Sequence, residues 1–349
     1  MAKAITLLES TNPESFEQGQ ELLDSLLPHT GKALRIGITG VPGVGKSTFI
    51  EAFGLFLIEH GHRVAVLAVD PSSPITGGSI MGDKTRMKEL SQHPDSFIRP
   101  SPSSGVLGGV ARKTRETVLI CEAAGYDIVF VETVGVGQSE TLVDSMVDLF
   151  MLLMLPNAGD ELQGIKKGVL ELADLVVVNK SDGVQASQAI TTQSEYRKAM
   201  QLLSSSKNSW EPQILRCSAL EKQGMDTIWE AVKNFREALQ NSGEWEQQRR
   251  SQSEKWMWTL VEEGLLNNFH KNKIIQKGIA RTFQNLELFE NATVLQNLLL
   301  GRHIYKKSNL LTEMFFTPAV KKSEKEQRIK TEEVIDFLNL QHLHQLIHF

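Results

Sequence analysis

Six short, mostly apolar runs recur along the chain, each bounded by glycine, proline or small polar residues. They are residues 34–39, 63–69, 127–131, 148–155, 175–178 and 212–216. Runs of this length and composition indicate strands that are covered on both faces, which is typical of parallel sheets. The sequence therefore predicts six buried strands.

Helical periodicity fills several of the segments between these runs. Thr48–His60 carries apolar residues at the spacing of one helix face, and Asn12 followed by Pro13 and Glu14 predicts the start of an earlier helix. Alternation of strands and helices indicates an α/β fold with a doubly wound, mostly parallel sheet. We expect an N-terminal helical extension before it and a mixed, mainly helical tail after it.

A glycine-rich segment follows the first predicted strand and opens the helix over Thr48–His60. Its sequence, GVPGVGKS, matches the phosphate-loop pattern G-x-x-x-x-G-K-[ST]. Backbone N–H groups of such a loop bind phosphate oxygens, Lys46 reaches the β- and γ-phosphates, and the Ser47 hydroxyl binds Mg²⁺. The predicted nucleotide contacts here are Gly40, Val41, Pro42, Gly43, Val44, Gly45, Lys46, Ser47 and Thr48.

Two acidic residues stand where predicted strands end. Asp70 follows the run over 63–69, and Glu132 follows the run over 127–131. Ligands of parallel sheets bind beyond the carboxyl ends of the strands, where such acids hold Mg²⁺ through water or orient the attacking water. We therefore predict Lys46, Asp70 and Glu132 as catalytic residues of a nucleotide hydrolase.

The fifth run is followed by Asn179-Lys180-Ser181-Asp182, an N-K-x-D sequence. The Asp182 carboxylate can accept hydrogen bonds from guanine N1–H and the 2-amino group, a donor pair that adenine lacks. Asn179 would bind the O6/N7 edge, and the Lys180 stem would cover the ring. Ser218 and Ala219, which follow the sixth run, resemble a loop whose backbone also touches guanine. The predicted nucleotide is therefore GTP or GDP.

Bulk properties narrow the class of protein. The net charge of −5 gives no indication of nucleic-acid binding, and no apolar stretch is long enough to span a membrane. The two cysteines, Cys121 and Cys217, suit a reducing compartment rather than a disulfide scaffold. The first residues lead into no long apolar segment of a secretory signal. We expect a cytoplasmic protein.

Residues 1 to about 270 closely resemble the MeaB/ArgK GTPases, the methylmalonyl-CoA-mutase-associated proteins. The resemblance rests on the phosphate loop, the N-K-x-D sequence and the stretches AVDPSSP, GDKTRM and VETVGVGQSE. It implies a GTPase chaperone that gates cofactor loading of an adenosylcobalamin-dependent acyl-CoA mutase and protects that enzyme. It also implies Ser47, Asp70, Asp83 and Glu132 as the Mg²⁺ apparatus, Gln163 and Lys166 as a switch that senses the mutase, and a homodimer formed through a C-terminal arm.

The chain changes character near Lys273. Residues from about 273 to 340 resemble an internal part of LivG-type ABC-transporter ATPases, with Gln284 at the Q-loop position but no phosphate loop. We expect no ATP binding there, a strand over 280–284 and helices near 294–301 and 324–340. The predicted segments are the extension (1–30), the GTPase domain (31–242), the helical start of the dimerisation arm (243–272) and the ATPase-like fragment (273–349).

Other functions stay open on the sequence. The chain could be a nucleotide-dependent binding module without significant hydrolysis, or a fusion whose replaced arm impairs dimerisation. The older family name suggests a kinase linked to amino-acid transport, which ranks low. Nickel-metallochaperone GTPases also rank low, because their His- and Cys-rich tracts are absent. The missing water-orienting glutamine predicts slow intrinsic turnover that a partner raises.

Overall fold

The computed structural model describes residues 1–10, 12–69, 87–100, 107–133, 139–156, 167–203, 209–271 and 318–337. The chain divides into two units, Met1–Met257 and Trp258–Phe349. No finding tests the predicted boundaries at residues 30, 242 and 272, which stay predictions.

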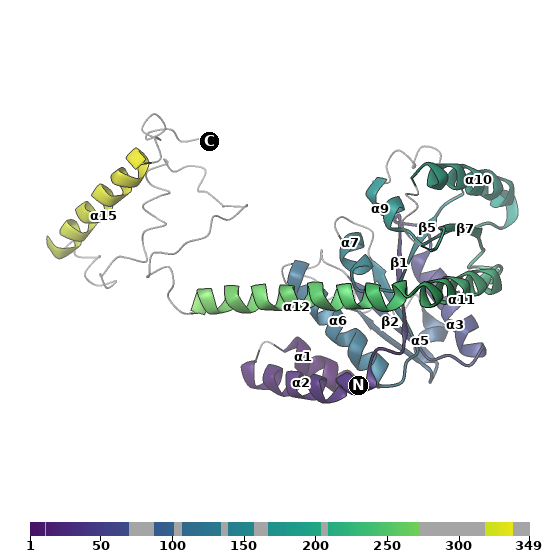
Figure 1. Cartoon of the computed structure of the whole chain (residues 1–349), viewed down its shortest axis with the longest axis horizontal. Coiled ribbons are helices and arrows are strands. Elements are labelled where there is room, and N and C mark those ends of the chain that lie inside the picture. Colours follow the sequence, from purple (N-terminus) through teal and green to yellow (C-terminus); the bar gives the residue numbers. More distant parts are fainter. Residues whose placement is uncertain are drawn as a thin grey trace. The chain divides into compact units, whose positions relative to one another are not determined.

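The described part of the first unit is built on a seven-stranded parallel sheet (Figure 1). The strand order is β3-β2-β4-β1-β5-β6-β7, and every pair is parallel. The prediction of a doubly wound α/β sheet is thereby confirmed. The strands are β1 (Leu34–Gly40), β2 (Val64–Val69), β3 (Ser96–Pro100), β4 (Ile128–Thr133), β5 (Leu149–Met154), β6 (Leu175–Val178) and β7 (Gln213–Arg216).

Helices cover both faces of this sheet. One hydrophobic cluster joins one face to α3, α5 and α11, and two others join the opposite face to α6, α7, α9 and α10. The helices are α3 (Lys46–Glu59), α5 (Lys88–Gln92), α6 (Leu107–Ala123), α7 (Ser139–Asp144), α9 (Lys167–Leu172), α10 (Ala186–Leu203) and α11 (Met225–Ser242), with the 3-10 turn η2 (Gly183–Gln185).

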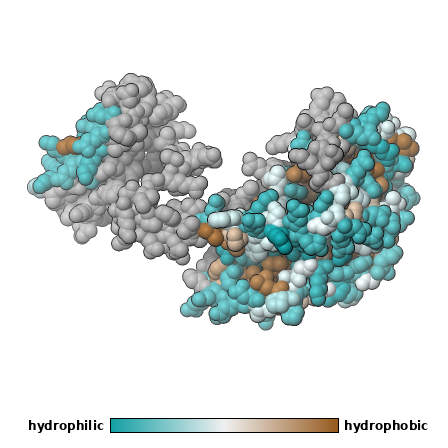
Figure 2. Space-filling view, in the orientation of Figure 1, coloured by the Kyte–Doolittle hydropathy of each residue, from teal (hydrophilic) through white to brown (hydrophobic). Residues whose placement is uncertain are grey.

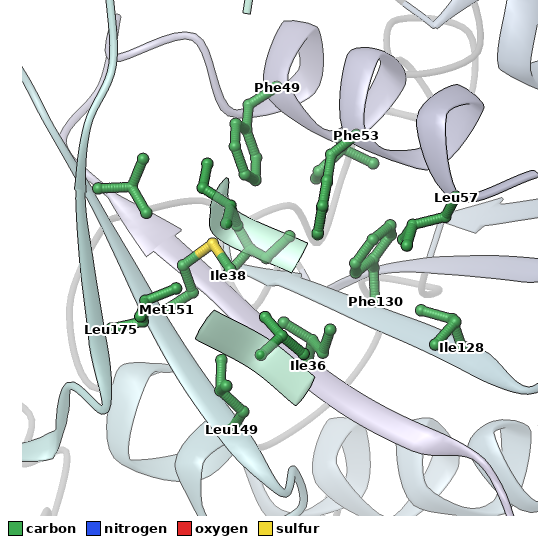
Figure 3. Close-up of a cluster of buried hydrophobic side chains, with 14 of the residues drawn as sticks. Ile36, Ile38, Phe49, Phe53, Leu57, Ile128, Phe130, Leu149, Met151 and Leu175 are labelled. Carbon is green, nitrogen blue, oxygen red and sulfur yellow. The ribbon is translucent and has the colours of Figure 1, made fainter. Parts of the chain in front are cut away.

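Strand residues alternate between the two faces, as a period of two requires. Ile128 and Phe130 enter the cluster under α3, whereas Val129 and Val131 enter the cluster under α6. In Figure 3 the side chains of Phe49, Phe53 and Leu57 point from α3 toward the sheet. Both faces of each central strand are buried, so the strand sequences are mostly apolar, and their polar residues include Glu132 and Thr133 at the end of β4.

The N-terminal extension consists of two helices, α1 (Ala2–Glu9) and α2 (Pro13–Leu26), followed by the 3-10 turn η1 (Leu27–His29). The Asn12 side chain accepts the backbone N–H groups of Glu14 and Ser15, which confirms it as the cap. Helix α1 has no side-chain cap, and no separate helix was predicted at this position within the extension. Ile5 and Leu8 of this helix pack with Leu119 of α6. These tertiary contacts stabilise a short helix that has no recognisable helix signal in its own sequence.

Strand β3 was also missed. Its sequence, SFIRP, contains a serine, an arginine and a proline, and no continuous apolar run. Among the described strands β3 lies at the edge of the sheet and pairs with β2 alone, so it needs no apolar covering on every residue. The strand over 128–133 is consequently the fourth in the chain, not the third. Helix α5 before β3 begins at Lys88, and residues 84–86 lie outside the described residues.

Helix α12 (Glu244–Lys271) begins in the first unit. Its first turns form hydrogen bonds with residues that lie at the start of β1 and β5. Arg249 donates from Nε to Asp148 Oδ1 at 2.8 Å and from a terminal nitrogen to Oδ2 at 2.7 Å. It also donates to the carbonyl oxygens of Gly31 and Ala33. The Asp148 side chain is 1 % exposed. This paired charge fixes the first turns of α12 to the sheet.

Arg249→Ala should destabilise the protein by about 3 kcal/mol, because it leaves a buried carboxylate without its guanidinium partner. Urea unfolding followed by circular dichroism would measure the change. The matched control is Arg250→Ala, since Arg250 is the next residue and is exposed. Equal stability of the two variants would contradict the assignment of Arg249 as an anchor.

A second acid lies at the start of β6. Burial raises the pKa of Asp174 to about 7, although the Phe150 N–H group that it accepts favours ionisation. Its unfolded pKa is close to the ordinary 3.8. The folded state therefore binds more protons between about pH 4 and pH 7, and ionisation of this acid lowers the free energy of unfolding as the pH rises through that window.

Asp174→Asn should raise the free energy of unfolding at pH 8 by about 2 kcal/mol, with the gain vanishing near pH 4. The asparagine oxygen can still accept the Phe150 N–H group, so the change removes mainly the charge. Denaturant unfolding at several pH values would show it, with Asp24→Asn on the exposed face of α2 as control. A gain that does not depend on pH would contradict the prediction.

The second unit contributes few described residues beyond α12. Helix α15 spans Pro318–Phe337, which overlaps the helix expected near 324–340. The expected strand over 280–284, the helix near 294–301 and Gln284 lie outside the described residues, and the likeness to transporter ATPases stays a prediction. The residue Trp258 of α12 is 58 % exposed.

Candidate nucleotide site

The phosphate loop joins β1 to α3 in a conformation that only glycine permits at two points. Gly40 ends β1, and a Cβ atom there would lie 2.5 Å from the carbonyl oxygen of Leu153 on β5. Gly45 has φ +90° and caps α3 in the left-handed region. The loop is therefore held tightly against the sheet, with the N-terminus of α3 directly behind it.

Lys46 is the first residue of α3, and its side chain folds back over the loop. Its Nζ donates to the carbonyl oxygen of Gly40 at 2.8 Å, and the residue is 9 % exposed. Burial lowers the pKa of Lys46, while the charges of Glu132 and Glu140 act in the opposite direction. The ammonium group therefore stands at the loop with two carboxylates close enough to stabilise its charge.

Glu132 enters the site from the end of β4. It lies beside Ile38 of β1 and Ala68 of β2 in the sheet register, and it is 7 % exposed. The next residue, Thr133, donates its hydroxyl to that of Thr39 at 2.7 Å, with both residues buried. This bond joins the carboxyl ends of β1 and β4, which sets Glu132 against the loop.

Asn179 links the phosphate loop to the guanine-motif region. Its Nδ2 donates to the carbonyl oxygen of Val44 at 2.9 Å, and its Oδ1 accepts the backbone N–H of Ala219 at 3.1 Å. The side chain is buried, and Oδ1 also accepts the Cys217 thiol. An amide nitrogen carries two hydrogens, so one donor is left for the O6/N7 edge of a base.

The other two members of the N-K-x-D sequence lie on the exposed side of the loop. Lys180 has φ +58° and donates from Nζ to the carbonyl oxygen of Gly43 at 2.9 Å. Its stem therefore runs along the phosphate loop. Asp182 precedes η2, and its carboxylate makes no hydrogen bond to the described residues. A guanine-reading carboxylate requires two acceptor oxygens of this kind, which no described group of the protein occupies.

The loop after β7 completes this edge. Ser218 pairs with Gln223 through two backbone hydrogen bonds, and its hydroxyl accepts the Glu221 N–H at 3.1 Å. Ala219 is fixed by Asn179, as described above. Both residues are buried, at 1 % and 5 % exposure. The structure thus brings the predicted loop, Glu132 and the guanine-motif residues to one edge of the sheet, the carboxyl ends of the strands.

Several predicted site residues cannot be placed. Asp70, Asp83, Gln163 and Lys166 lie outside the described residues. Ser47 lies half-buried and Thr48 exposed in the first turn of α3. Glu140, near the start of α7, was not predicted, although it stands close enough to raise the pKa of Lys46. The sequence feature that could have indicated Glu140 is its place two residues after Gln138, in the glycine-containing stretch that follows Glu132.

Arg112 on α6 has partners of its own, because it donates to Glu116 at 2.9 Å and stacks over Phe16. No helix in the described parts of the chain is both long and apolar enough to cross a bilayer. The described face in Figure 2 is mostly hydrophilic, with small hydrophobic patches.

Comparisons with known proteins show the family to which the chain is similar. The family model described as "Methylmalonyl Co-A mutase-associated GTPase MeaB" matches residues 1–274. The chain is 55 % identical over 277 residues to a probable GTPase of Mycobacterium tuberculosis, covering 79 % of this chain and 82 % of the relative. It is 52 % identical over 273 residues to the GTPase ArgK of Escherichia coli, covering 78 % and 82 %.

A mitochondrial relative and a solved structure extend the comparison. The mouse "Methylmalonic aciduria type A homolog, mitochondrial" is 48 % identical over 289 residues, covering 80 % of this chain and 70 % of the relative. The crystal structure titled "LAO/AO transport system kinase" aligns with a TM-score of 0.67 and 40 % identity, covering 90 % of this chain and 92 % of that chain. The likeness therefore holds in both sequence and fold.

Proposed function

Because the chain belongs to the family of methylmalonyl-CoA mutase-associated GTPases, we propose that it is a Mg²⁺-dependent GTPase acting as a chaperone of an adenosylcobalamin-dependent acyl-CoA mutase. The reaction is GTP + H₂O → GDP + phosphate. The observation that carries the proposal is the Asn179 link between the phosphate loop and the loop at Ala219, which makes one site from a phosphate-binding part and a base-reading part.

Lys46 supplies positive charge to the transferred phosphoryl group. In the structure its ammonium group binds the Gly40 carbonyl, next to the backbone N–H groups of the loop and the N-terminus of α3. These groups stabilise negative charge on the β- and γ-phosphate oxygens. Glu132 lies on the strand next to the loop, where its carboxylate can orient water for in-line attack.

The residues of the site fit Mg²⁺. This ion prefers oxygen ligands, and it commonly takes one or two protein ligands with substrate phosphates and water completing its shell. The Ser47 hydroxyl and the Glu132 carboxylate provide oxygen at the loop and at the end of β4. We propose that these two, with Asp70 and Asp83, hold the ion, in part directly and in part through its bound water. When bound, Mg²⁺ neutralises charge that develops on the phosphate oxygens.

Base recognition uses the hydrogen-bond donors and acceptors of the N-K-x-D sequence that the described residues leave unused. The Asp182 carboxylate accepts the N1–H and 2-amino groups, and the second Nδ2 hydrogen of Asn179 reaches the O6/N7 edge. The Lys180 stem covers one face of the base, as its position along the loop allows. Adenine offers no matching donor pair, so GTP is preferred.

The chaperone role couples this site to the mutase. Gln163 and Lys166 are proposed to sense the bound mutase, and hydrolysis then gates cofactor loading. Slow intrinsic turnover, raised by the partner, fits the lack of a water-orienting glutamine. We propose a homodimer formed through the arm that starts in α12. Both cysteines are buried and unpaired, in keeping with a reducing cytoplasm.

The test is steady-state GTP hydrolysis with and without a methylmalonyl-CoA mutase, together with size-exclusion chromatography of the mixture. We expect a complex whose formation depends on the nucleotide and a rate that rises on complex formation. Complex formation without any hydrolysis would favour the binding-module alternative. Absence of both would overturn the chaperone role.

A further inference from the structure

Cys217 lies directly beside Asn179, and the proposed function gives it no role. It follows β7 and is 3 % exposed. Its backbone N–H donates to the carbonyl oxygen of Val178, and its carbonyl oxygen accepts the N–H of Ser181, both at 2.9 Å. These two bonds flank Asn179 in the sequence, so the backbone of Cys217 is fixed against the N-K-x-D sequence independently of its side chain.

The thiol of Cys217 contacts the amide of Asn179, with Sγ 3.4 Å from Oδ1. The two amide atoms are distinguished by their other partners. Nδ2 faces the Val44 carbonyl oxygen, which can only accept, and Oδ1 faces the Ala219 N–H, which can only donate. The thiol must therefore be a donor. It keeps its proton at neutral pH, because burial, and secondarily the charge of Asp182, raise the pKa of Cys217 to about 12.

The two donors together use the whole acceptor capacity of Oδ1. An amide oxygen has two lone pairs, of which the Ala219 N–H takes one at 3.1 Å and the thiol takes the other. Nδ2 uses one hydrogen on Val44, so its second hydrogen is what the described residues leave unused on Asn179. A Cβ atom at Gly45 would lie 3.1 Å from Nδ2, so the glycine keeps the space beside that nitrogen clear.

We infer that Cys217 is a positioning residue for guanine recognition, which holds the Asn179 amide with its NH₂ group toward the phosphate loop and the base. The inference rests on the proposed function, in which Asn179 binds the O6/N7 edge. Because Oδ1 is fully occupied, Asn179 can offer a base only a donor, and it requires an acceptor at that edge. Asp182 requires donors at N1 and the 2-amino group, so the two residues read opposite patterns.

Calorimetric titration of the full chain with GDP and two analogues tests this role. 7-Deazaguanosine diphosphate lacks N7, and 6-thioguanosine diphosphate has sulfur, a weaker acceptor, in place of O6. Both keep the N1–H and 2-amino groups that Asp182 would bind. We expect the wild-type protein to bind one analogue about 2- to 10-fold more weakly than GDP, which identifies the acceptor that Asn179 uses.

Cys217→Ala should weaken GDP binding by a similar factor, about 2- to 10-fold, because Oδ1 loses a donor and the amide is no longer held in one orientation. Binding of the affected analogue, which lacks the Asn179 contact already, should stay nearly unchanged. The difference between GDP and that analogue should therefore shrink. Cys217→Ser keeps a donor beside Oδ1 and should retain more GDP affinity than Cys217→Ala.

Cys121→Ala is the matched control, since Cys121 is the other buried cysteine and packs in the cluster under α6. It should change neither GDP affinity nor the difference between GDP and the analogues. Equal weakening of GDP and both analogues by Cys217→Ala would overturn the inference, as would equal losses in the serine and alanine variants. Equal affinity of the wild-type protein for GDP and both analogues would overturn it as well. Wild-type binding of ADP as tight as that of GDP would instead overturn the proposed function.

Discussion

Lys46→Ala should lower the rate of GTP hydrolysis at least about 10²-fold. Loss of a single preorganised group that stabilises transition-state charge typically has an effect of this size. In this protein the ammonium group is fixed by the Gly40 carbonyl, and the charges of Glu132 and Glu140 favour its protonated form. The alanine variant keeps the backbone N–H groups of the loop, so nucleotide binding should weaken less than turnover.

Single-turnover experiments with radiolabelled GTP measure the rate of hydrolysis without interference from product release, and so test this prediction. Lys88→Ala is the matched control, because Lys88 begins a neighbouring helix, α5, and is exposed. Melting curves of both variants show whether the fold is intact. If Lys46→Ala kept more than a tenth of the wild-type rate, Lys46 would not be the residue that stabilises the transferred phosphoryl group.

Asp182→Asn should weaken GDP binding by about 10- to 10²-fold. Each hydrogen bond to the charged Asp182 carboxylate contributes about 1.5 to 3 kcal/mol, and asparagine can accept only one of the two. The same change should improve binding of xanthosine diphosphate. Xanthine has a carbonyl at position 2 in place of the amino group, and the asparagine NH₂ can donate to it.

Calorimetric titration with GDP, xanthosine diphosphate and ADP separates the outcomes. Asp24→Asn, at an exposed position of α2, controls for the change in net charge. A variant that loses GDP and xanthosine diphosphate equally would show that Asp182 supports the loop rather than reads the base. Tight binding of ADP by the wild type would contradict guanine selection altogether.

The parts of this structure that could be predicted are those in which one local run of residues determines the outcome. The phosphate loop is such a run, because Gly40, Gly45 and Lys46 each do their work within a few residues of one another. The central strands were also predicted, since burial on both faces leaves an uninterrupted apolar sequence. The guanine motif could be recognised because it directly follows one of those strands.

The missed features depend on partners that are distant in the sequence. Strand β3 exists because β2 offers an edge, and α1 exists because Leu119 and Ile120 of α6 accept its apolar face. Glu140 is significant only through its nearness to Lys46. The roles of Asp70, Asp83, Gln163 and Lys166 stay predictions that rest on position in the sequence and on the family resemblance.

The position of Asn179 has a consequence for any attempt to change the base that this protein recognises. Its amide supports Val44 in the phosphate loop and Ala219 in the loop after β7 at the same time. A substitution of Asn179 that is meant to change the preferred base also removes its hydrogen bond to the phosphate loop. It would therefore weaken phosphate binding, on which every nucleotide depends. In the proposed function Asp182 reads the base and carries no such second duty, so a change of base specificity that keeps the Asn179 contacts passes through Asp182.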